Sequence, residues 1–344
     1  MKIIKRKLYD VLAPNKSTGI INGQSSNVLN WDDVRFRWAF PLYKNMLANF
    51  WTPFEVNMGG DVKQWGATLS EDEKETFARI IGLLAFLDSI QTDYSSKVAD
   101  YLTDSSLTAL MAVLAQQEVV HQHSYSYVLS SLVPKHKQDE IFEYWKHDTV
   151  LRERNDFIAK GYENFTEEPT AEELLKSIVY DVILEGLFFY ASFAFFYDLA
   201  RQGKMSGTST MINYINRDEQ LHVTLFTNIF KEILNENPEL NTPELRAFVY
   251  ETFEQAVELE VKWGHYIIGE KFDGIDGNDL EEYVKFTANK RLGQLGLEKL
   301  YPDAHNTMRW IQYFENIDDS KTDFFEQKPR QYTKTDDANG FDDL

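Results

Sequence analysis

Apolar side chains recur every three or four positions through most of the chain, which is the spacing of amphipathic α-helices. No stretch shows a sustained alternation of apolar and polar residues, so we do not expect a major sheet. Start and stop signals predict helices over about 33–50, 71–99, 105–132, 136–160, 170–203, 207–235, 243–269 and 279–300. Ser70 and Glu73 form a capping-box pattern at one of these starts. Long helices joined by short loops predict an all-α bundle.

The two ends of the chain differ from this helical pattern. Residues 1–30 mix Pro14, Gly19 and Gly23 with polar side chains, which predicts an N-terminal arm with little regular structure. The helical domain is expected over 31–314. From 315 to 344 aspartates dominate and apolar periodicity is lost, which predicts a flexible acidic tail.

Composition narrows the class of protein. With 344 residues, 43% hydrophobic and 26% charged, the chain resembles ordinary globular proteins. A net charge of −20 argues against a nucleic-acid partner, because phosphate binding requires clustered lysine and arginine. The absence of cysteine excludes disulfides and zinc–thiolate sites and suits a reducing compartment. Any thiol chemistry must therefore belong to another chain.

We expect no membrane association. The N-terminal residues hold no apolar stretch long enough for a signal peptide. The most apolar run, Val182 to Tyr197, is shorter than the roughly 20 residues that a membrane span needs, and Glu185 interrupts it. These features predict a cytoplasmic protein.

Two Glu-x-x-His pairs, Glu118/His121 and Glu219/His222, carry the candidate chemistry. Positions three apart share one face of a helix, so each pair can present two ligands to one point. Asp88 lies 30 residues before the first pair and Glu185 lies 34 before the second, both within apolar sequence. The order carboxylate, Glu-x-x-His, carboxylate, Glu-x-x-His amounts to a degenerate internal repeat over four helices.

Burial of these acids requires a compensating positive charge. An unpaired ionised carboxylate among apolar residues costs several kcal/mol, and neither Arg nor Lys lies near Asp88 or Glu185 in the sequence. Four carboxylates and two imidazoles around two divalent cations resolve this cost, and they form the ligand set of di-iron and di-manganese bundles. Iron and manganese both accept these ligands. The competing interpretation is a set of unrelated buried salt bridges.

Further residues fall near this predicted centre by helical spacing. Tyr125 follows His121 by one turn and is a candidate radical site, although most of the 18 tyrosines must be packing residues. Asp218 is a candidate hydrogen-bond partner for a ligating histidine, or an ordinary exposed aspartate. Three apolar residues lie one or two turns from ligands: Phe189, Phe193 and Ile215.

The sequence resembles the small, radical-generating subunit of class I ribonucleotide reductase, a ferritin-like family. The matching stretches are Leu87–Gln91, Glu118–Tyr125, Glu185–Tyr190 and Arg217–His222, and their order and spacing hold across about 35–330. The resemblance implies a homodimer with a dimetal site at all six ligand positions. It also implies a tyrosyl radical at Tyr125, with Phe189, Phe193 and Ile215 forming the pocket around it.

The same resemblance implies an electron relay and a partner. Trp51 matches the family's relay tryptophan and would join Asp218 and His121 in a hydrogen-bonded chain. Tyr332, with Glu326 before it, is placed like the relay tyrosine of the tail. The last residues, 340–344, look like the segment that docks on the large subunit, where ribonucleotides would be reduced to deoxyribonucleotides.

Other functions share part of this pattern. Another ferritin-like oxidase, such as a ligand-binding oxidase or a hydroxylase, would keep the six ligands without needing Tyr332. An iron-storage protein would need a cage of many subunits. We expect two iron ions, and a di-manganese or manganese–iron centre stays open.

Overall fold

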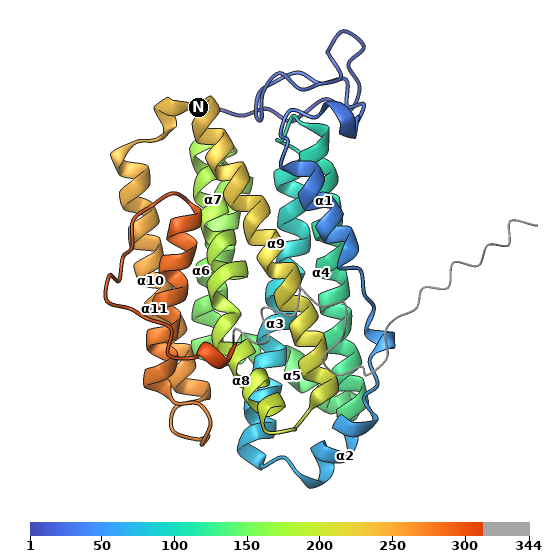
Figure 1. Ribbon diagram of the computed structural model, residues 1–344, viewed down its shortest axis with the longest axis vertical. Coiled ribbons are helices and arrows are strands. Elements are labelled where there is room, and N and C mark those ends of the chain that lie inside the picture. The colour runs from blue at the N-terminus through green and yellow to red at the C-terminus, as the bar shows by residue number, and fades with distance from the viewer. Residues whose placement is uncertain (312–344) are drawn as a thin grey trace, which may run out of the picture.

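Helices form nearly all of the regular structure in the computed structural model, which describes residues 1–311 (Figure 1). The α-helices are α1 (Ala39–Ala48), α2 (Gly59–Ala67), α3 (Glu71–Ala99), α4 (Ser105–Leu132), α5 (Lys135–His147), α6 (Thr149–Glu167), α7 (Ala171–Ile183), α8 (Tyr190–Arg201), α9 (Ser206–Glu236), α10 (Pro243–Ile267) and α11 (Gly277–Gln294). A π-helix, η3 (Leu184–Phe188), joins α7 to α8. Short 3₁₀ turns are η1 (Trp31–Asp33), η2 (Pro53–Glu55), η4 (Pro238–Leu240) and η5 (Arg309–Ile311). Within 1–311 the β-structure is limited to two isolated bridges, so the all-α prediction is confirmed.

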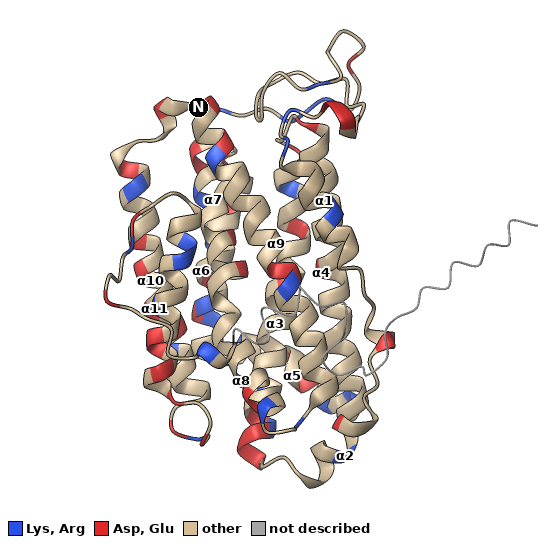
Figure 2. Cartoon of the chain, viewed as in Figure 1, with Lys and Arg blue, Asp and Glu red and all other residues tan. Residues whose placement is uncertain are grey.

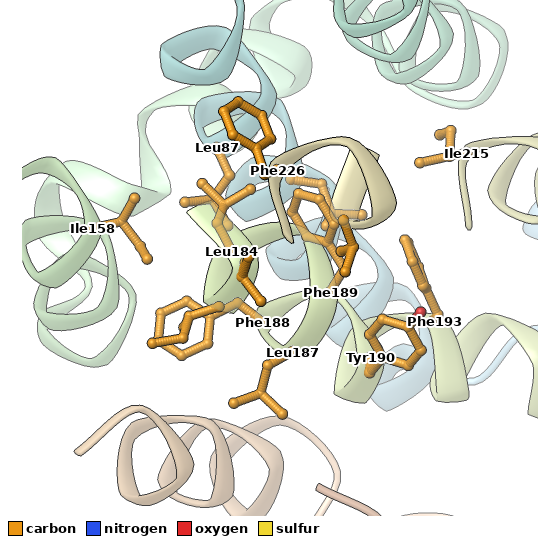
Figure 3. Packing of buried hydrophobic residues seen from close by; sticks show 14 of the residues in the cluster. Leu87, Ile158, Leu184, Leu187, Phe188, Phe189, Tyr190, Phe193, Ile215 and Phe226 are labelled. Atoms are coloured by element: carbon orange, nitrogen blue, oxygen red, sulfur yellow. The ribbon is translucent and has the colours of Figure 1, made fainter. Parts of the chain in front are cut away.

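The long helices α3, α4 and α9 and the α7–η3–α8 stretch form the centre of the bundle (Figure 1). Helix α3 packs along α4, while α7 and η3 pack against α9. Helices α10 and α11 cover the outer side of α7, and α1 lies against α4 and α9. Leucine, isoleucine and phenylalanine side chains fill the space between these helices (Figure 3). The predicted bundle with additional helices is therefore confirmed.

Local capping explains where several helices begin. The Ser70 hydroxyl accepts the Glu73 N–H, and the Glu73 carboxylate accepts the Ser70 N–H, which completes the predicted capping box of α3. Asp104 accepts the Ser106 N–H at the start of α4. Both boundaries agree with the sequence prediction.

The single helix predicted over 136–160 is wrong. Asp148 ends α5 with extended backbone, and its carboxylate caps the N–H groups of Val150 and Leu151 to begin α6. Helix α6 also continues through Gly161, where the prediction ended it. A Cβ on Gly161 would lie 2.1 Å from the Tyr180 ring. This glycine therefore serves close packing of α6 against α7 and does not end the helix.

Two other boundaries differ from the prediction, and one helix was missed. Helix α1 begins at Ala39, because Pro41 is tolerated only in a first turn. Helix α2 was not predicted. Helix α11 ends at Gln294, since Gly296 adopts φ +84° and the Leu297 N–H bonds back to Leu292. The predicted 170–203 helix is continuous except for the π-helical turn η3.

Residues 1–30 contain no α-helix, as predicted, yet they are anchored to the bundle. Ile3 and Ile20 are buried. The Ser17 hydroxyl donates to Asp104 at 2.6 Å, and the Ile20 N–H donates to Glu236 at 2.7 Å. These contacts join the arm to the start of α4 and the end of α9. The predicted tail, with Tyr332 and Glu326, lies outside the described residues.

Within residues 1–311, one stretch has the length and hydropathy of a membrane span. It is Ala171–Arg201, with a mean hydropathy of 1.6 over its best window, and 94% of that window is buried inside the bundle. Burial on this scale identifies the stretch as a core helix and explains its apolar composition.

On the outer helices, acidic and basic residues are interspersed rather than gathered on a basic face (Figure 2).

Candidate metal centre

The six predicted ligands meet inside the bundle, and each is at most 1% exposed. Helix α3 supplies Asp88, α4 supplies one Glu-x-x-His pair, η3 supplies Glu185, and α9 supplies the second pair. Their ligand atoms form two overlapping groups, each within 4.8 Å across: Asp88, Glu118 and His121; and Glu118, Glu185, Glu219 and His222. Glu118 belongs to both groups.

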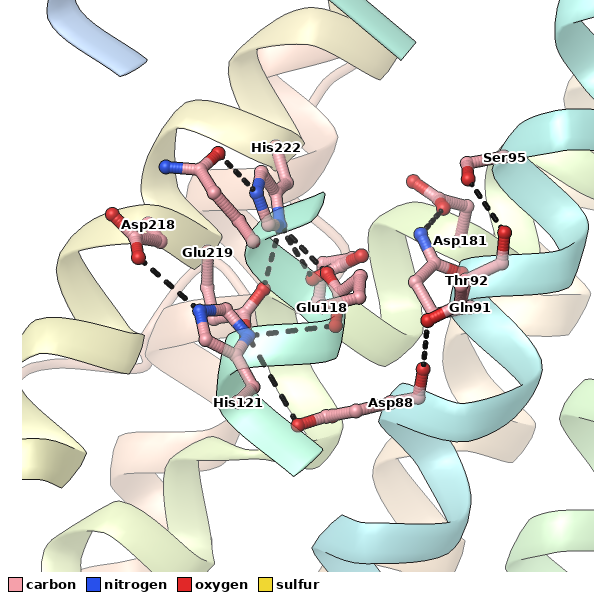
Figure 4. Close-up of polar contacts among 12 residues, drawn as sticks. Asp88, Gln91, Thr92, Ser95, Glu118, His121, Asp181, Asp218, Glu219 and His222 are labelled. Carbon is pink, nitrogen blue, oxygen red and sulfur yellow. Dashed lines mark hydrogen bonds and ion pairs between the residues drawn. The ribbon is translucent and has the colours of Figure 1, made fainter. Parts of the chain in front are cut away.

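The first group centres on His121 (Figure 4). Its Nδ1 lies 3.4 Å from Glu118 Oε2 and 3.2 Å from Glu219 Oε1. Asp88 Oδ2 lies at 4.0 Å from the same nitrogen. One imidazole nitrogen therefore faces three carboxylates from three helices.

The second group repeats this arrangement around His222. Its Nδ1 lies 3.0 Å from Glu118 Oε1, 3.0 Å from Glu219 Oε2 and 3.4 Å from Glu185 Oε2. Glu118 and Glu219 thus each direct one oxygen to His121 and the other to His222. Asp88 and Glu185 each serve one side, so the cluster has two subsites joined by two shared carboxylates.

These donors fit two divalent cations. Seven buried ligand atoms have no hydrogen-bond partner among the described residues: both oxygens of Asp88, both of Glu118, one each of Glu185 and Glu219, and His121 Nδ1. Buried polar atoms are rarely left unpaired, and buried carboxylates require positive charge. Oxygen and imidazole donors without thiolate suit iron or manganese.

The pKa values of the cluster reflect the same shortage of positive charge. Burial, with the repulsion of neighbouring carboxylates, raises the pKa of Asp88 and of Glu185 well above the usual range. Burial alone would lower the pKa of His121, but Glu118 and Glu219 raise it well above its ordinary value. Burial would also raise the pKa of Glu219, yet hydrogen bonds from Glu185 and the two histidines hold it low. Without metal, the cluster holds protons in place of cations.

The outer nitrogen of His121 contacts the predicted partner. Asp218 Oδ2 lies 3.2 Å from His121 Nε2 and accepts the Trp51 indole N–H at 2.9 Å. Asp218 is fully buried, so the alternative of an exposed helix aspartate is excluded. A proton on His121 Nε2 satisfies Asp218 and leaves the Nδ1 lone pair directed at the first subsite.

The partner of His222 was missed by the sequence analysis. His222 Nε2 lies 3.1 Å from Gln117 Oε1. Gln117 immediately precedes Glu118, as Asp218 immediately precedes Glu219. In each half of the repeat, the residue before the glutamate therefore supports the histidine of the other half. The internal repeat was the signal that could have identified Gln117.

Tyr125 is buried next to the first subsite. It is 1% exposed, and its hydroxyl has no hydrogen bond of ordinary geometry within 1–311. Burial raises the pKa of the Tyr125 phenol well above its usual range, with Asp88 the strongest charged contributor. Phe189 and Phe193 are buried and lie 5.7 Å apart between ring centroids, and Ile215 is also buried (Figure 3). Their contact with Tyr125 stays a prediction.

Residues 28–307 match the protein family described as ribonucleotide reductase, small chain. The chain belongs to this family. A ribonucleoside-diphosphate reductase subunit β from Halalkalibacterium halodurans is 67% identical over 341 residues, which cover 99% of each chain.

Solved structures of ribonucleotide reductase small chains share the fold. A putative class I enzyme from Bacillus halodurans has a TM-score of 0.86 and 68% identity, covering 90% of this chain and 99% of its own. The R2 subunit from Clostridium botulinum has a TM-score of 0.88 and 38% identity, covering 91% and 99%. The resemblance inferred from the four sequence stretches is confirmed.

Proposed function

We propose that this chain is the β subunit of a ribonucleoside-diphosphate reductase, which generates and stores a radical used by a separate large subunit to reduce ribonucleotides. The observation that carries the proposal is the buried cluster of four carboxylates and two imidazoles with seven unpartnered ligand atoms. We further propose that it acts in the cytoplasm.

The metal ligands are proposed as Asp88, Glu118, His121, Glu185, Glu219 and His222. Glu118 and Glu219 would contribute to both subsites, since each directs one oxygen towards His121 and the other towards His222. Two bound ions supply oxygen activation and one-electron oxidation, chemistry that no side chain of this protein provides. Iron is our first expectation, and di-manganese or manganese–iron loading fits the same donors.

Tyr125 is the proposed radical site. Loss of an electron from the phenol releases its proton, because oxidation leaves the hydroxyl strongly acidic. Asp88 is the charged group that acts most strongly on this hydroxyl, and we assign it as the proton acceptor. The dry surroundings exclude solvent from the oxidised ring, which favours a long-lived radical. Phe189, Phe193 and Ile215 are proposed to line this pocket.

His121, Asp218 and Trp51 are proposed as the start of an electron relay. Contacts of 3.2 and 2.9 Å connect them without a gap, and Trp51 is 3% exposed. Tyr332 would continue the relay towards the large subunit. The chain has no cysteine, so the thiol chemistry of ribonucleotide reduction must take place on that partner.

Replacing Trp51 by phenylalanine is expected to lower reductase activity with the large subunit by about a hundredfold or more. Removing or misplacing a single functional group commonly lowers an enzyme's rate by this factor. The variant should keep its metals and its organic radical, because the Trp51 indole is not a ligand. Trp38→Phe is the matched control. The Trp38 indole N–H also donates to a carboxylate, that of Glu232, at a distance of 3.2 Å, and Glu232 is not one of the six proposed ligands. Equal activity of Trp51→Phe and wild type would remove Trp51 from the relay.

Residues 315–344 are proposed as the docking tail and 31–314 as the dimetal domain. Deleting 331–344 should abolish binding to the large subunit in a sedimentation or calorimetric assay while the metal content stays at the wild-type level. A hydroxylase or ligand-binding oxidase has no need of this segment. Retained reductase activity after the deletion would contradict the docking role, whereas a full-length chain that binds no large subunit would favour that alternative.

A homodimer is proposed through an apolar surface around α4. Leu47, Phe50, Phe54 and Val119 are 48–70% exposed, and the Phe54 ring packs on Tyr127 of α4. Contiguous exposed apolar side chains are typical of interaction surfaces. Phe50→Asp with Phe54→Asp should convert a dimer into a monomer by ultracentrifugation, whereas Leu12→Asp, an exposed apolar residue of the arm, should not. An assembly of many wild-type copies would favour iron storage.

A further inference from the structure

The ligand Glu185 lies in an unusual piece of backbone. Asp88, Glu118 and Glu219 come from regular α-helices, whereas Glu185 comes from the π-helix η3, Leu184–Phe188. A π-turn shifts backbone hydrogen bonds by one residue and is less stable than an α-turn. Backbone groups displaced in this way need partners from elsewhere, especially in a buried segment.

Two buried arginines from other helices supply these partners. Arg154 of α6 donates from Nη2 to the Phe188 carbonyl at 2.7 Å. Arg291 of α11 donates from Nε to the Gly186 carbonyl at 2.8 Å. Both side chains are at most 1% exposed. Burial of a guanidinium is costly, so two of them directed at carbonyls of one five-residue segment indicate a specific role.

Arg154 is part of a larger contact with the end of η3. It forms a buried ion pair with Glu260 of α10. The other oxygen of Glu260 accepts the Ala191 N–H at 3.2 Å, in the first turn of α8. One ion pair therefore holds a carbonyl at the end of the π-turn and an amide just after it.

Arg291 holds the residue directly after the ligand. It also donates to the Tyr190 hydroxyl at 2.5 Å and to Gln294 at 2.9 Å. A Cβ at position 186 would lie 2.7 Å from Arg291 Nε. Only glycine at this position lets the guanidinium approach the carbonyl beside Glu185.

We propose that Arg154, Glu260 and Arg291 are positioning residues that hold η3 in its π form and thereby set the affinity of the Glu185 subsite for its metal ion. This inference rests on the proposed metal function. The other subsite takes its terminal carboxylate from the regular helix α3, where the Asp88 carbonyl accepts the Gln122 side-chain amide at 3.1 Å and, among the described residues, no buried arginine donates to the backbone. Loosening the arginine contacts should therefore weaken one metal ion selectively.

The test uses the full-length Gly186→Ala and Arg291→Gln variants. Mn²⁺ titration is followed by the electron paramagnetic resonance signal of the free ion. In each variant the Kd of one Mn²⁺ site should rise about tenfold or more while the Kd of the other stays unchanged. A change of about tenfold is the usual effect of losing a side chain that supports a metal ligand. Hydrogen exchange in the metal-free proteins should be at least about tenfold faster for amides 184–191, because the supports of the π-turn are lost. Gly277→Ala is the control, since its Cβ would lie 2.3 Å from His265 Nδ1, a comparable clash at the start of α11, 14 residues before Arg291.

The outcomes separate the two hypotheses. Unchanged exchange at 184–191 in both variants would overturn the positioning role, whatever the metals do. Equal weakening of both ions, or the same pattern in Gly277→Ala, would also overturn it by indicating a general loss of packing. If wild-type protein bound no Mn²⁺ or Fe²⁺ at all, the metal function itself would fail, while the exchange result would still report on the π-turn.

Discussion

Phenylalanine at position 125 is expected to abolish the organic-radical signal of the metal-loaded protein and to lower reductase activity by about a thousandfold or more. The benzene ring of phenylalanine fills the same space but carries no phenolic proton to release with the electron. Because the buried hydroxyl that it removes interacts with Asp88 without a hydrogen bond of ordinary geometry, Tyr125→Phe should be about as stable to heat as wild type. Electron paramagnetic resonance, a reductase assay with the large subunit and thermal unfolding test the three expectations, and metal analysis confirms that each sample is loaded.

Tyr127→Phe provides the matched control. Tyr127 lies two residues further along α4, and its hydroxyl donates to the Val56 carbonyl at 3.1 Å, away from the ligands. This control should keep both radical and activity. A sharp organic-radical signal of wild-type intensity in Tyr125→Phe would show that the radical forms on another residue and would remove Tyr125 from the mechanism.

Glu118→Ala is expected to lower metal content from two ions per chain to less than one, because Glu118 belongs to both subsites. A metal ion that binds only the folded state stabilises it by an amount that grows with the logarithm of the metal concentration divided by Kd, about 3 kcal/mol at a hundred times Kd. Thermal unfolding with added Fe²⁺ or Mn²⁺ should therefore shift upward for wild type but not for the variant. Elemental analysis after gel filtration measures the bound ions directly.

The metal-free forms should show the opposite order of stability. In chelator, wild type buries carboxylates that repel one another, and Glu118→Ala removes one of them. The variant should then unfold at the same temperature as wild type or higher, as is common when an acidic functional residue is removed. A clear loss of stability in chelator would instead favour the salt-bridge interpretation. Glu163→Ala, an exposed change on α6, should alter neither measurement.

The ligand set could be predicted from sequence because the need for a positive charge follows from residues that are neighbours in the sequence. An acid within an apolar helix, such as Asp88 or Glu185, needs a partner that the neighbouring residues do not supply. The Glu-x-x-His spacing then shows which side chains share a helical face. The start of α3 was predictable for the same reason, since Ser70 and Glu73 satisfy each other's backbone within one turn.

Features that depend on distant contacts could not be predicted. The π-turn at Glu185 leaves no periodic mark, and the groups that support it, Arg154 and Arg291, lie 31 and 106 residues away in the sequence. In the sequence Gly161 predicts the end of a helix, and only the folded structure shows that the Tyr180 ring packs against this glycine. The contacts of Phe189, Phe193 and Ile215 depend likewise on how helices pack rather than on their spacing.

Each half of the cluster supplies one further carboxylate and one Glu-x-x-His pair, Asp88 in the first half and Glu185 in the second, and the halves also differ in the side chain behind each imidazole. Asp218, an anion, supports His121, whereas the neutral amide of Gln117 supports His222. Positive charge that develops on the His121 side is stabilised by this anion, while the same charge on the His222 side is not. In the relay proposed above, this difference between Asp218 and Gln117 would favour charge transfer from the His121 side of the centre towards Trp51.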